Sequence, residues 1–382
     1  MAAPLHRHQS SLEGILNFSS SHPPPLETEL RNRASRRFHA ICQHFDTGLS
    51  GNNYSRPRLV RFTYECSLSQ ESGDYFLRFF FKAVDLLIDG NEPINFEDVR
   101  TKFFEFAEYL FNNFFLPVKA STKKTPQPSP ALHSAIEEAQ GHRGQQYVGT
   151  GPRLSVLRRD CLIRDRHRCV ISRKFDFSEA IKRSRASGGP HDDEGNLIAN
   201  DPIEPAPLEV AHILPHSLTK VNENGELDAS KQSALAILDM FDVGVAELIR
   251  GPEIDRPRNA LTLTRDFHQY FGDFQVYFEP APYRDHVYIV RTHISGAFFF
   301  RPALPLTREL YLTPDRSIEP PSPRLLAIHC AIARILHLSG AGEYIDRIYR
   351  DMEEHGVQAD GSTPLGRFVS LAISEQSSSV YT

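Results

Sequence analysis

Three short strings in the chain have the residue types of a hydrolytic site. They are EVAHILPHS around His212, PRNALTL around Asn259 and RDFHQYFGDF around His268. An imidazole titrates near neutral pH, so a histidine can take a proton from water or ligate a metal ion. The chain has 17 histidines, and a bare His, Asn, His order therefore carries little information. The neighbouring residues are more informative. They are a strand ending in His-Ile-x-Pro, a Pro-x-Asn-x-Leu-Thr-Leu strand, and a histidine nine positions after the asparagine.

Together with RDRHRCVIS around Cys169, these strings resemble the HNH nuclease family, and within it the HNH-domain proteins of uncharacterised function found in fungi. The resemblance covers about residues 153–292. It implies a ββα-metal finger, in which two strands and a helix hold one divalent ion. It also implies hydrolysis of phosphodiester bonds in nucleic acid, DNA rather than RNA.

The resemblance gives each residue a role. His212 matches the general base, whose second ring nitrogen must donate to a backbone carbonyl. Asn259 matches the residue that braces the loop through amide hydrogen bonds and holds the base in register. His268 matches a ligand of the divalent ion, magnesium, manganese or zinc, which stabilises the charge that develops on the scissile phosphate.

Two positions depart from the family pattern. Ala211 stands where the wider family usually has a metal-binding Asp or His, and Gly272 stands where many members have a second histidine. Glu209, which strand alternation places on the same face as Ala211, and Asp273 are the candidates for the missing metal ligands. The sequence has no Cys-x-x-Cys pair, so no structural zinc is expected.

A basic stretch precedes the first string. Between Arg143 and Arg185, twelve Lys and Arg stand against four Asp and Glu, in a chain whose formal net charge is −5. Such a local excess is typical of a phosphate-binding surface, although a solvated helix face can have the same composition. The residues predicted to hold the nucleic-acid backbone are Arg164, Arg166, Arg168, Arg256 and Arg258.

Composition bounds the class of protein. A chain of 382 residues is long enough for two or three domains of about 150 residues. Five scattered cysteines indicate no disulfide framework. We expect an intracellular protein of the nucleus or cytoplasm, because no apolar run has the length of a signal peptide or a membrane span. The oligomeric state is not fixed by any motif.

The predicted elements that position the strings alternate between strands and helices, which indicates an α+β fold. Alternation predicts strands at 208–213, 260–263, 274–280 and 286–294, with a short helix at 266–271. Apolar residues at helical spacing predict helices at 26–45, 74–89, 96–115, 230–249, 322–338 and 342–352, with Asn95 as an N-cap. The predicted domains are a helical N-terminal region at 1–117, a linker at 118–152, an HNH nuclease-like domain at 153–300, and a C-terminal helical region with a frayed tail at 301–382.

These observations predict a metal-dependent HNH-type endonuclease. The alternative is a catalytically lapsed HNH scaffold that acts as a protein- or nucleic-acid-interaction module, with the Phe-rich N-terminal helices as the surface for a protein partner. Ala211, Gly272 and the acidic overall charge favour the alternative. Saturable metal binding that requires His268 would separate the two.

Overall fold

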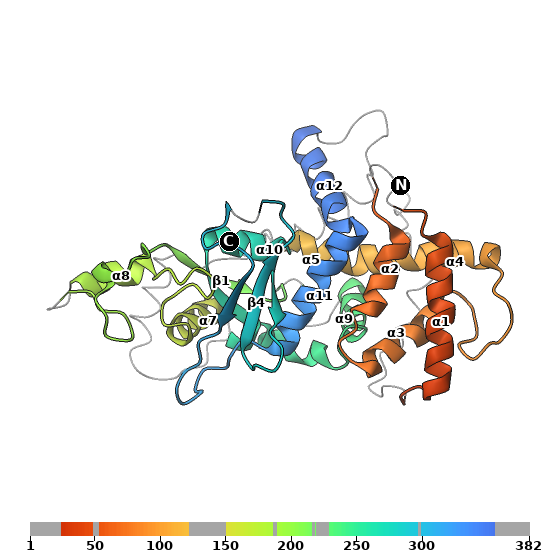
Figure 1. Ribbon diagram of the computed structural model, residues 1–382, viewed down its shortest axis with the longest axis horizontal. Coiled ribbons are helices and arrows are strands. Elements are labelled where there is room, and N and C mark those ends of the chain that lie inside the picture. The colour runs from red at the N-terminus through yellow and green to blue at the C-terminus, as the bar shows by residue number, and fades with distance from the viewer. Residues whose placement is uncertain are drawn as a thin grey trace, which may run out of the picture. The chain divides into compact units, whose positions relative to one another are not determined.

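The structure is a computed structural model that describes residues 24–48, 53–121, 150–185, 189–215, 218, 229–296 and 299–355 (Figure 1). The chain divides into two compact units. Unit 1 comprises Met1–Ser121, Ser217–Leu248 and Ala331–Thr382, and unit 2 comprises Thr122–His216 and Ile249–Cys330. Each unit is therefore assembled from segments that lie far apart in the sequence.

The predicted domain boundaries followed the chain without interruption, whereas both units are discontinuous. Helix α5, Leu116–Ser121, continues into the range 118–152 that was predicted as a linker. The rest of that linker up to residue 149 and the predicted frayed tail lie outside the described residues. The boundaries themselves stay a prediction.

Unit 1 is helical in the part that the structure describes. Its elements are α1 (Thr28–Phe45), α2 (Arg56–Glu65), α3 (Gln70–Ala83), α4 (Phe96–Leu110), the π-helical turn η1 (Phe111–Phe115), α5, α9 (Ala229–Asp239), the 3-10 turn η5 (Val245–Leu248) and α12 (Ala341–His355). Asn95 caps α4, as predicted, by accepting a hydrogen bond from the backbone N of Glu97 at 3.3 Å. The sequence analysis missed α2, whose start is marked by the capping residue Ser55 and by Pro57.

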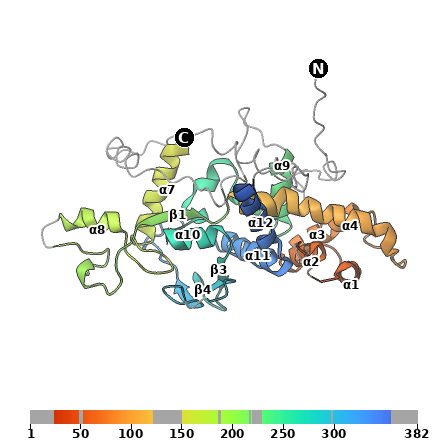
Figure 2. The same cartoon turned by 90° about the horizontal axis from the view of Figure 1, so that it is seen from above.

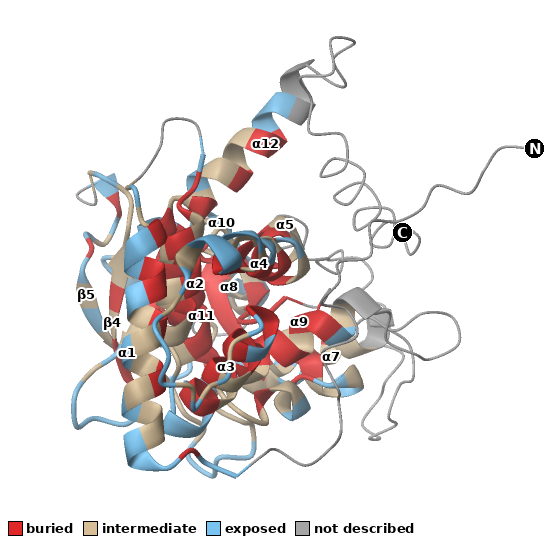
Figure 3. Ribbon diagram, turned by 90° about the vertical axis from the view of Figure 1, so that its right-hand side faces the viewer, coloured by how far each residue is buried: buried red, intermediate tan, exposed pale blue. Residues whose placement is uncertain are grey.

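Phenylalanine rings form the core of unit 1. Phe38 of α1 meets Phe80 of α3 edge to face, with ring centroids 4.9 Å apart, and Phe80 meets Phe106 of α4 at 5.5 Å. All three side chains are fully buried, and Figure 3 shows buried and exposed positions alternating along α1. The rings therefore stabilise the unit internally, and these Phe side chains are not available to the protein partner predicted for them.

Unit 2 has mixed helices and strands, which agrees with the predicted α+β class. Its elements are α7 (Thr150–Arg164), α8 (Phe177–Ser184), η3 (Ile198–Asn200), β1 (Leu208–His212), η6 (Gly251–Asp255), η7 (Pro257–Asn259), β2 (Ala260–Thr264), α10 (Arg265–Gly272), β3 (Val276–Pro280), β4 (Val287–Thr292) and β5 (Leu306–Glu309). Helix α11 (Pro323–Ser339) begins in unit 2 and ends in unit 1. Strands β3, β4 and β5 form an antiparallel sheet.

The first two strands of unit 2 form the frame of the candidate site. β1 and β2 are antiparallel, and His212 lies opposite Ala260 in their register. Helix α10 follows β2 directly and packs against β1, and the two lie side by side in Figures 1 and 2. The predicted strands at 208–213 and 260–263 and the predicted helix at 266–271 are thus confirmed to within two residues.

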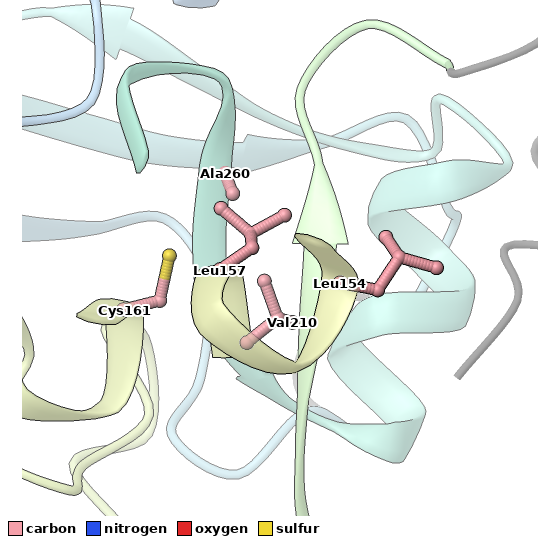
Figure 4. Close-up of a cluster of buried hydrophobic side chains, with 5 residues drawn as sticks. All are labelled: Leu154, Leu157, Cys161, Val210 and Ala260. Carbon is pink, nitrogen blue, oxygen red and sulfur yellow. The ribbon is translucent and has the colours of Figure 1, made fainter. Parts of the chain in front are cut away.

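A small apolar cluster fixes α7 on the other side of this frame. Figure 4 shows Leu154, Leu157 and Cys161 of α7 with Val210 of β1 and Ala260 of β2. All five are buried. Because α7 contacts both strands, its polar side chains are held beside the end of β1, where His212 lies.

Among the described residues, no single helix is long and apolar enough to cross a bilayer. One bent pair, α11 with α12 as far as Asp351, passes that test on length and composition alone.

Candidate active site

His212 is the last residue of β1, and its surroundings define its chemistry. The side chain is 3% exposed, and Nε2 lies 3.2 Å from Oδ1 of Asp255. Because a carboxylate only accepts hydrogen bonds, Nε2 donates to Asp255, and the lone pair of a neutral imidazole in this position is on Nδ1. The sequence analysis expected a backbone carbonyl as the acceptor. The structure places a buried carboxylate there.

Asp255 is a site residue that the sequence analysis did not identify. It is the last residue of η6, its side chain is 2% exposed, and its Oδ2 accepts a hydrogen bond from Nε of Arg153 at 3.2 Å. The Arg153 guanidinium lies on the side of this carboxylate away from Oδ1, the atom that contacts His212. In the sequence, Asp255 is a single acidic residue four positions before Asn259. No spacing rule connects such a residue to His212.

Asn259 is fully buried and connects the segment after β1 to the segment before β2. Its Oδ1 accepts from the backbone N of Leu214 at 3.0 Å, and its Nδ2 donates to the carbonyls of Leu214 at 3.1 Å and Ile254 at 3.0 Å. Its own carbonyl accepts from Ile213 N at 2.7 Å. These hydrogen bonds hold the backbone that follows His212, at Ile213 and Leu214, against the segment before β2.

His268 lies in the middle of α10 and contacts Glu209 of β1. Nδ1 of His268 lies 2.7 Å from Oε2 of Glu209, and the two side chains are 12% and 29% exposed. The hydrogen bond from His268 lowers the pKa of Glu209 and outweighs the burial of the carboxyl. The structure thus brings together two of the residues predicted as metal ligands, one with a nitrogen donor and one with an ionised oxygen donor.

One known protein family has a sequence pattern that matches this part of the chain. Residues 169–279 match the family model described as HNH endonuclease. This segment of the chain is similar to an HNH endonuclease domain. The match covers less than a third of the chain, and it includes His212, Asn259 and His268. No curated protein and no solved structure matches the chain.

Glu209 and His268 are two of the predicted metal ligands, and they lie in contact. Two neighbouring ligands of an octahedral ion, each at 2.0–2.1 Å, lie about 2.9 Å apart, which is close to the separation of Nδ1 of His268 and Oε2 of Glu209. The described residues contain no group of three or more His, Cys, Asp and Glu side chains that would hold a metal. Glu209 and His268 alone would supply two ligands, and an ion bound there would take the others from water or phosphate oxygens, as Mg²⁺ often does.

The two positions that depart from the family pattern supply no metal ligand in the structure. Ala211 is buried opposite Leu261, and Gly272 is the last residue of α10. Asp273 caps that helix, five positions past His268 and about 7.5 Å further along the helix axis. Because it belongs to no described group of three ligands, it does not complete the pair of Glu209 and His268.

Arg164 was predicted to bind the nucleic-acid backbone, and the structure corrects this. Its side chain is completely buried and donates through Nε and Nη2 to Asp165, at 2.8 Å each. Its Nη groups also donate to the carbonyls of Pro257 and Ala260, at 2.7 and 2.9 Å. Arg164 therefore fastens α7 to β2 and does not reach a phosphate at the surface.

Other arginines of the basic stretch pair with acidic residues further along the chain. Arg168 pairs with Asp192 at 2.9 Å and with Asp201 at 2.7 Å, and its side chain is 14% exposed. Arg166 pairs with Glu194 and is 38% exposed. The local charge excess counted between residues 143 and 185 thus overstates the positive charge that the folded HNH domain presents.

Arg256 and Arg258 share acidic partners beside the HNH strands. Arg256 Nε donates to Glu319 at 2.9 Å, and Arg258 donates to Glu253 at 2.5 Å. Arg256 is 47% exposed and Arg258 is 21% exposed. Of the five predicted arginines, Arg256 and Arg166 are the most accessible to a phosphate.

Proposed function

We propose that the protein is a metal-dependent endonuclease that hydrolyses phosphodiester bonds, with DNA as the expected substrate. The observation that carries the proposal is the arrangement within one HNH domain. His212 is held by Asp255, the segment next to it is braced by Asn259, and the pair of Glu209 and His268 lies on the same frame of β1, β2 and α10.

His212 acts as the general base in this proposal. Its Nδ1 takes a proton from water while the water oxygen bonds to phosphorus, and the bond from phosphorus to the leaving oxygen breaks. The leaving oxygen takes a proton from solvent. Asp255 stabilises the imidazolium that forms, because its carboxylate already bonds to Nε2 and needs no reorganisation during the step.

Glu209 and His268 are the residues that would hold the divalent ion. When bound, the ion supplies electrostatic stabilisation of the charge on the scissile phosphate and the leaving oxygen. The chain's own contribution is position, since β1 fixes Glu209 three residues before His212 and so fixes the pair relative to the base.

The second candidate function is a lapsed HNH scaffold that binds a protein or a nucleic acid without cleaving it. Two observations favour it. His212 is only 3% exposed, and Ala211 and Gly272 supply no ligand. In this case metal titration shows no saturable binding that depends on His268.

The deciding experiment is cleavage of supercoiled plasmid, single-stranded DNA and RNA with magnesium, manganese or zinc. We compare the full chain with His212→Ala and with the control His39→Ala, whose histidine is 40% exposed in unit 1. Metal-dependent nicking that is lost only in His212→Ala supports the nuclease. Folded protein that cleaves no substrate with any metal, or a His212→Ala variant that cleaves as fast as wild type, overturns it.

A further inference from the structure

Many of the described arginines of unit 2 pair with an acidic residue, and Arg173 and Arg308 are among those that do not. Arg153, Arg164, Arg166, Arg168, Arg183, Arg256 and Arg258 each pair with an Asp or Glu. Arg173 and Arg308 form no ion pair with any described residue. Both are half-buried, so their positive charges are partly removed from water without an acidic partner.

These two arginines lie together although they are far apart in the chain. Arg308 of β5 donates from Nε to the carbonyl of Ile171 at 2.6 Å, and Arg173 donates from Nη2 to the carbonyl of Glu309. The turn that contains Arg173 is also hydrogen-bonded to strand β2, because Val170 N donates to Thr262 O at 2.9 Å.

The ring of Tyr311 contacts the guanidinium groups of Arg173 and of a third arginine, Arg166. The ring centroid lies 4.1 Å from the guanidinium carbon of Arg173 and 5.0 Å from that of Arg166. We call Arg166, Arg173, Arg308 and Tyr311 the Tyr311 arginine cluster. Both ring contacts are cation–π interactions, which fix the direction of a guanidinium without removing its charge.

Placing guanidinium groups close together is electrostatically unfavourable. Burial and the nearby Arg173 guanidinium lower the pKa of Arg308, because both make its positive charge less favourable than in water. Arg166 and Arg173 also have left-handed backbones, with φ of 54° and 65°, which disfavour residues that have a Cβ. A bound anion would offset the repulsion between Arg173 and Arg308.

We propose that the Tyr311 arginine cluster binds the phosphate backbone of a nucleic acid, at a place separate from His212 and His268. The inference rests on the proposed function, because the nuclease activity is what makes a nucleic acid the expected anion. Guanidinium groups suit this ligand, since their planar N–H groups bond phosphate oxygens in pairs. The cluster would orient the strand and carry no base specificity.

The test is binding of a fluorescently labelled DNA duplex by the full chain, measured by anisotropy in EDTA across a series of salt concentrations. The variants are Arg173→Gln, Arg308→Gln and the double variant. Each lost phosphate contact lowers the slope of log K against log salt by about 0.9, so the double variant loses about 1.8. The control is Arg291→Gln, whose arginine pairs with Glu279 on the neighbouring strand β3. It should keep the wild-type slope.

Lysine variants at the same positions should restore most of the slope, because they keep the charge. If the glutamine variants do not fold, Arg166→Gln takes their place, since its side chain is partly exposed and its removal opens no buried gap. A folded double variant with wild-type affinity and slope overturns the inference, and so does a wild-type chain that binds no duplex.

The binding assay needs no cleavage, so the two proposals fail separately. Loss of binding in the variants of a chain that never cleaves DNA supports the cluster and removes the nuclease. Normal binding by the variants of an active nuclease removes the cluster alone.

Discussion

The carboxylate of Glu209 lies 2.7 Å from Nδ1 of His268, although 59 residues separate them in the chain. The contact exists because α10 begins immediately after β2 and packs back on β1, so that a residue of the helix meets a residue of the strand. This pair is the basis of the first prediction.

We predict that His268→Ala and Glu209→Gln each weaken Mn²⁺ binding by at least about tenfold, because each removes one of two protein ligands. The measurement is calorimetric titration of the full chain with the metal alone. His39→Ala, in unit 1, should bind as wild type does. Equal affinity in all four proteins would show that the ion, if any, binds elsewhere.

Asp255→Asn should lower kcat for plasmid nicking by about 10² or more and leave KM nearly unchanged. An amide can donate to Nε2 of His212, which moves the ring proton to Nδ1 and leaves the wrong nitrogen basic. Steady-state cleavage rates across substrate concentrations separate the two constants. An unchanged kcat in the folded variant would remove Asp255 from the mechanism.

Arg164→Ala should lower the free energy of unfolding by about 3–5 kcal/mol, because it leaves the buried Asp165 carboxylate without its partner. Urea denaturation of the purified variant measures this. Arg100→Ala, which removes an exposed pair with Glu97 on α4, should cost about 1 kcal/mol or less. Similar costs for the two changes would contradict the structural role assigned to Arg164.

His329 of α11 predicts a pH dependence of stability. Burial lowers its pKa from 6.5 to about 3, while Nε2 donates to the carbonyl of Phe271. Between these two pH values the unfolded chain binds the proton and the folded chain does not. The contribution of His329 is therefore complete above pH 6.5 and falls as the pH is lowered toward 3.

The expected slope from this one group is about 1.4 kcal/mol per pH unit. Denaturation of wild type and His329→Phe across this window measures it, since Phe keeps the stacking on Phe271 and Phe274 and cannot take a proton. Parallel curves for the two proteins would show that His329 does not titrate on unfolding.

Local patterns predicted the elements around the site with good accuracy. Strands β1 and β2 and helix α10 formed where alternation and helical spacing placed them, because the period of the apolar residues depends on neighbours only a few positions away. The family resemblance of the strings around His212, Asn259 and His268 has the same local origin, and the family model matches the segment that contains them.

The predicted nucleic-acid surface was less accurate for a physical reason. A charge count within a window of sequence includes Arg168 but not Asp192 and Asp201, which pair with it from beyond that window. Electrostatic compensation depends on distance in space, which the window does not measure.

The sequence by itself determined the α+β class, the order of strand, strand and helix, and three residues with the chemistry of an HNH site. Only the tertiary structure decided which distant groups lie side by side: Asp255 beside His212, Glu209 beside His268, and Arg308 beside Arg173. These contacts join residues 43 to 135 positions apart, and they exist because packed helices and strands bring distant backbone segments within hydrogen-bonding and Coulomb range.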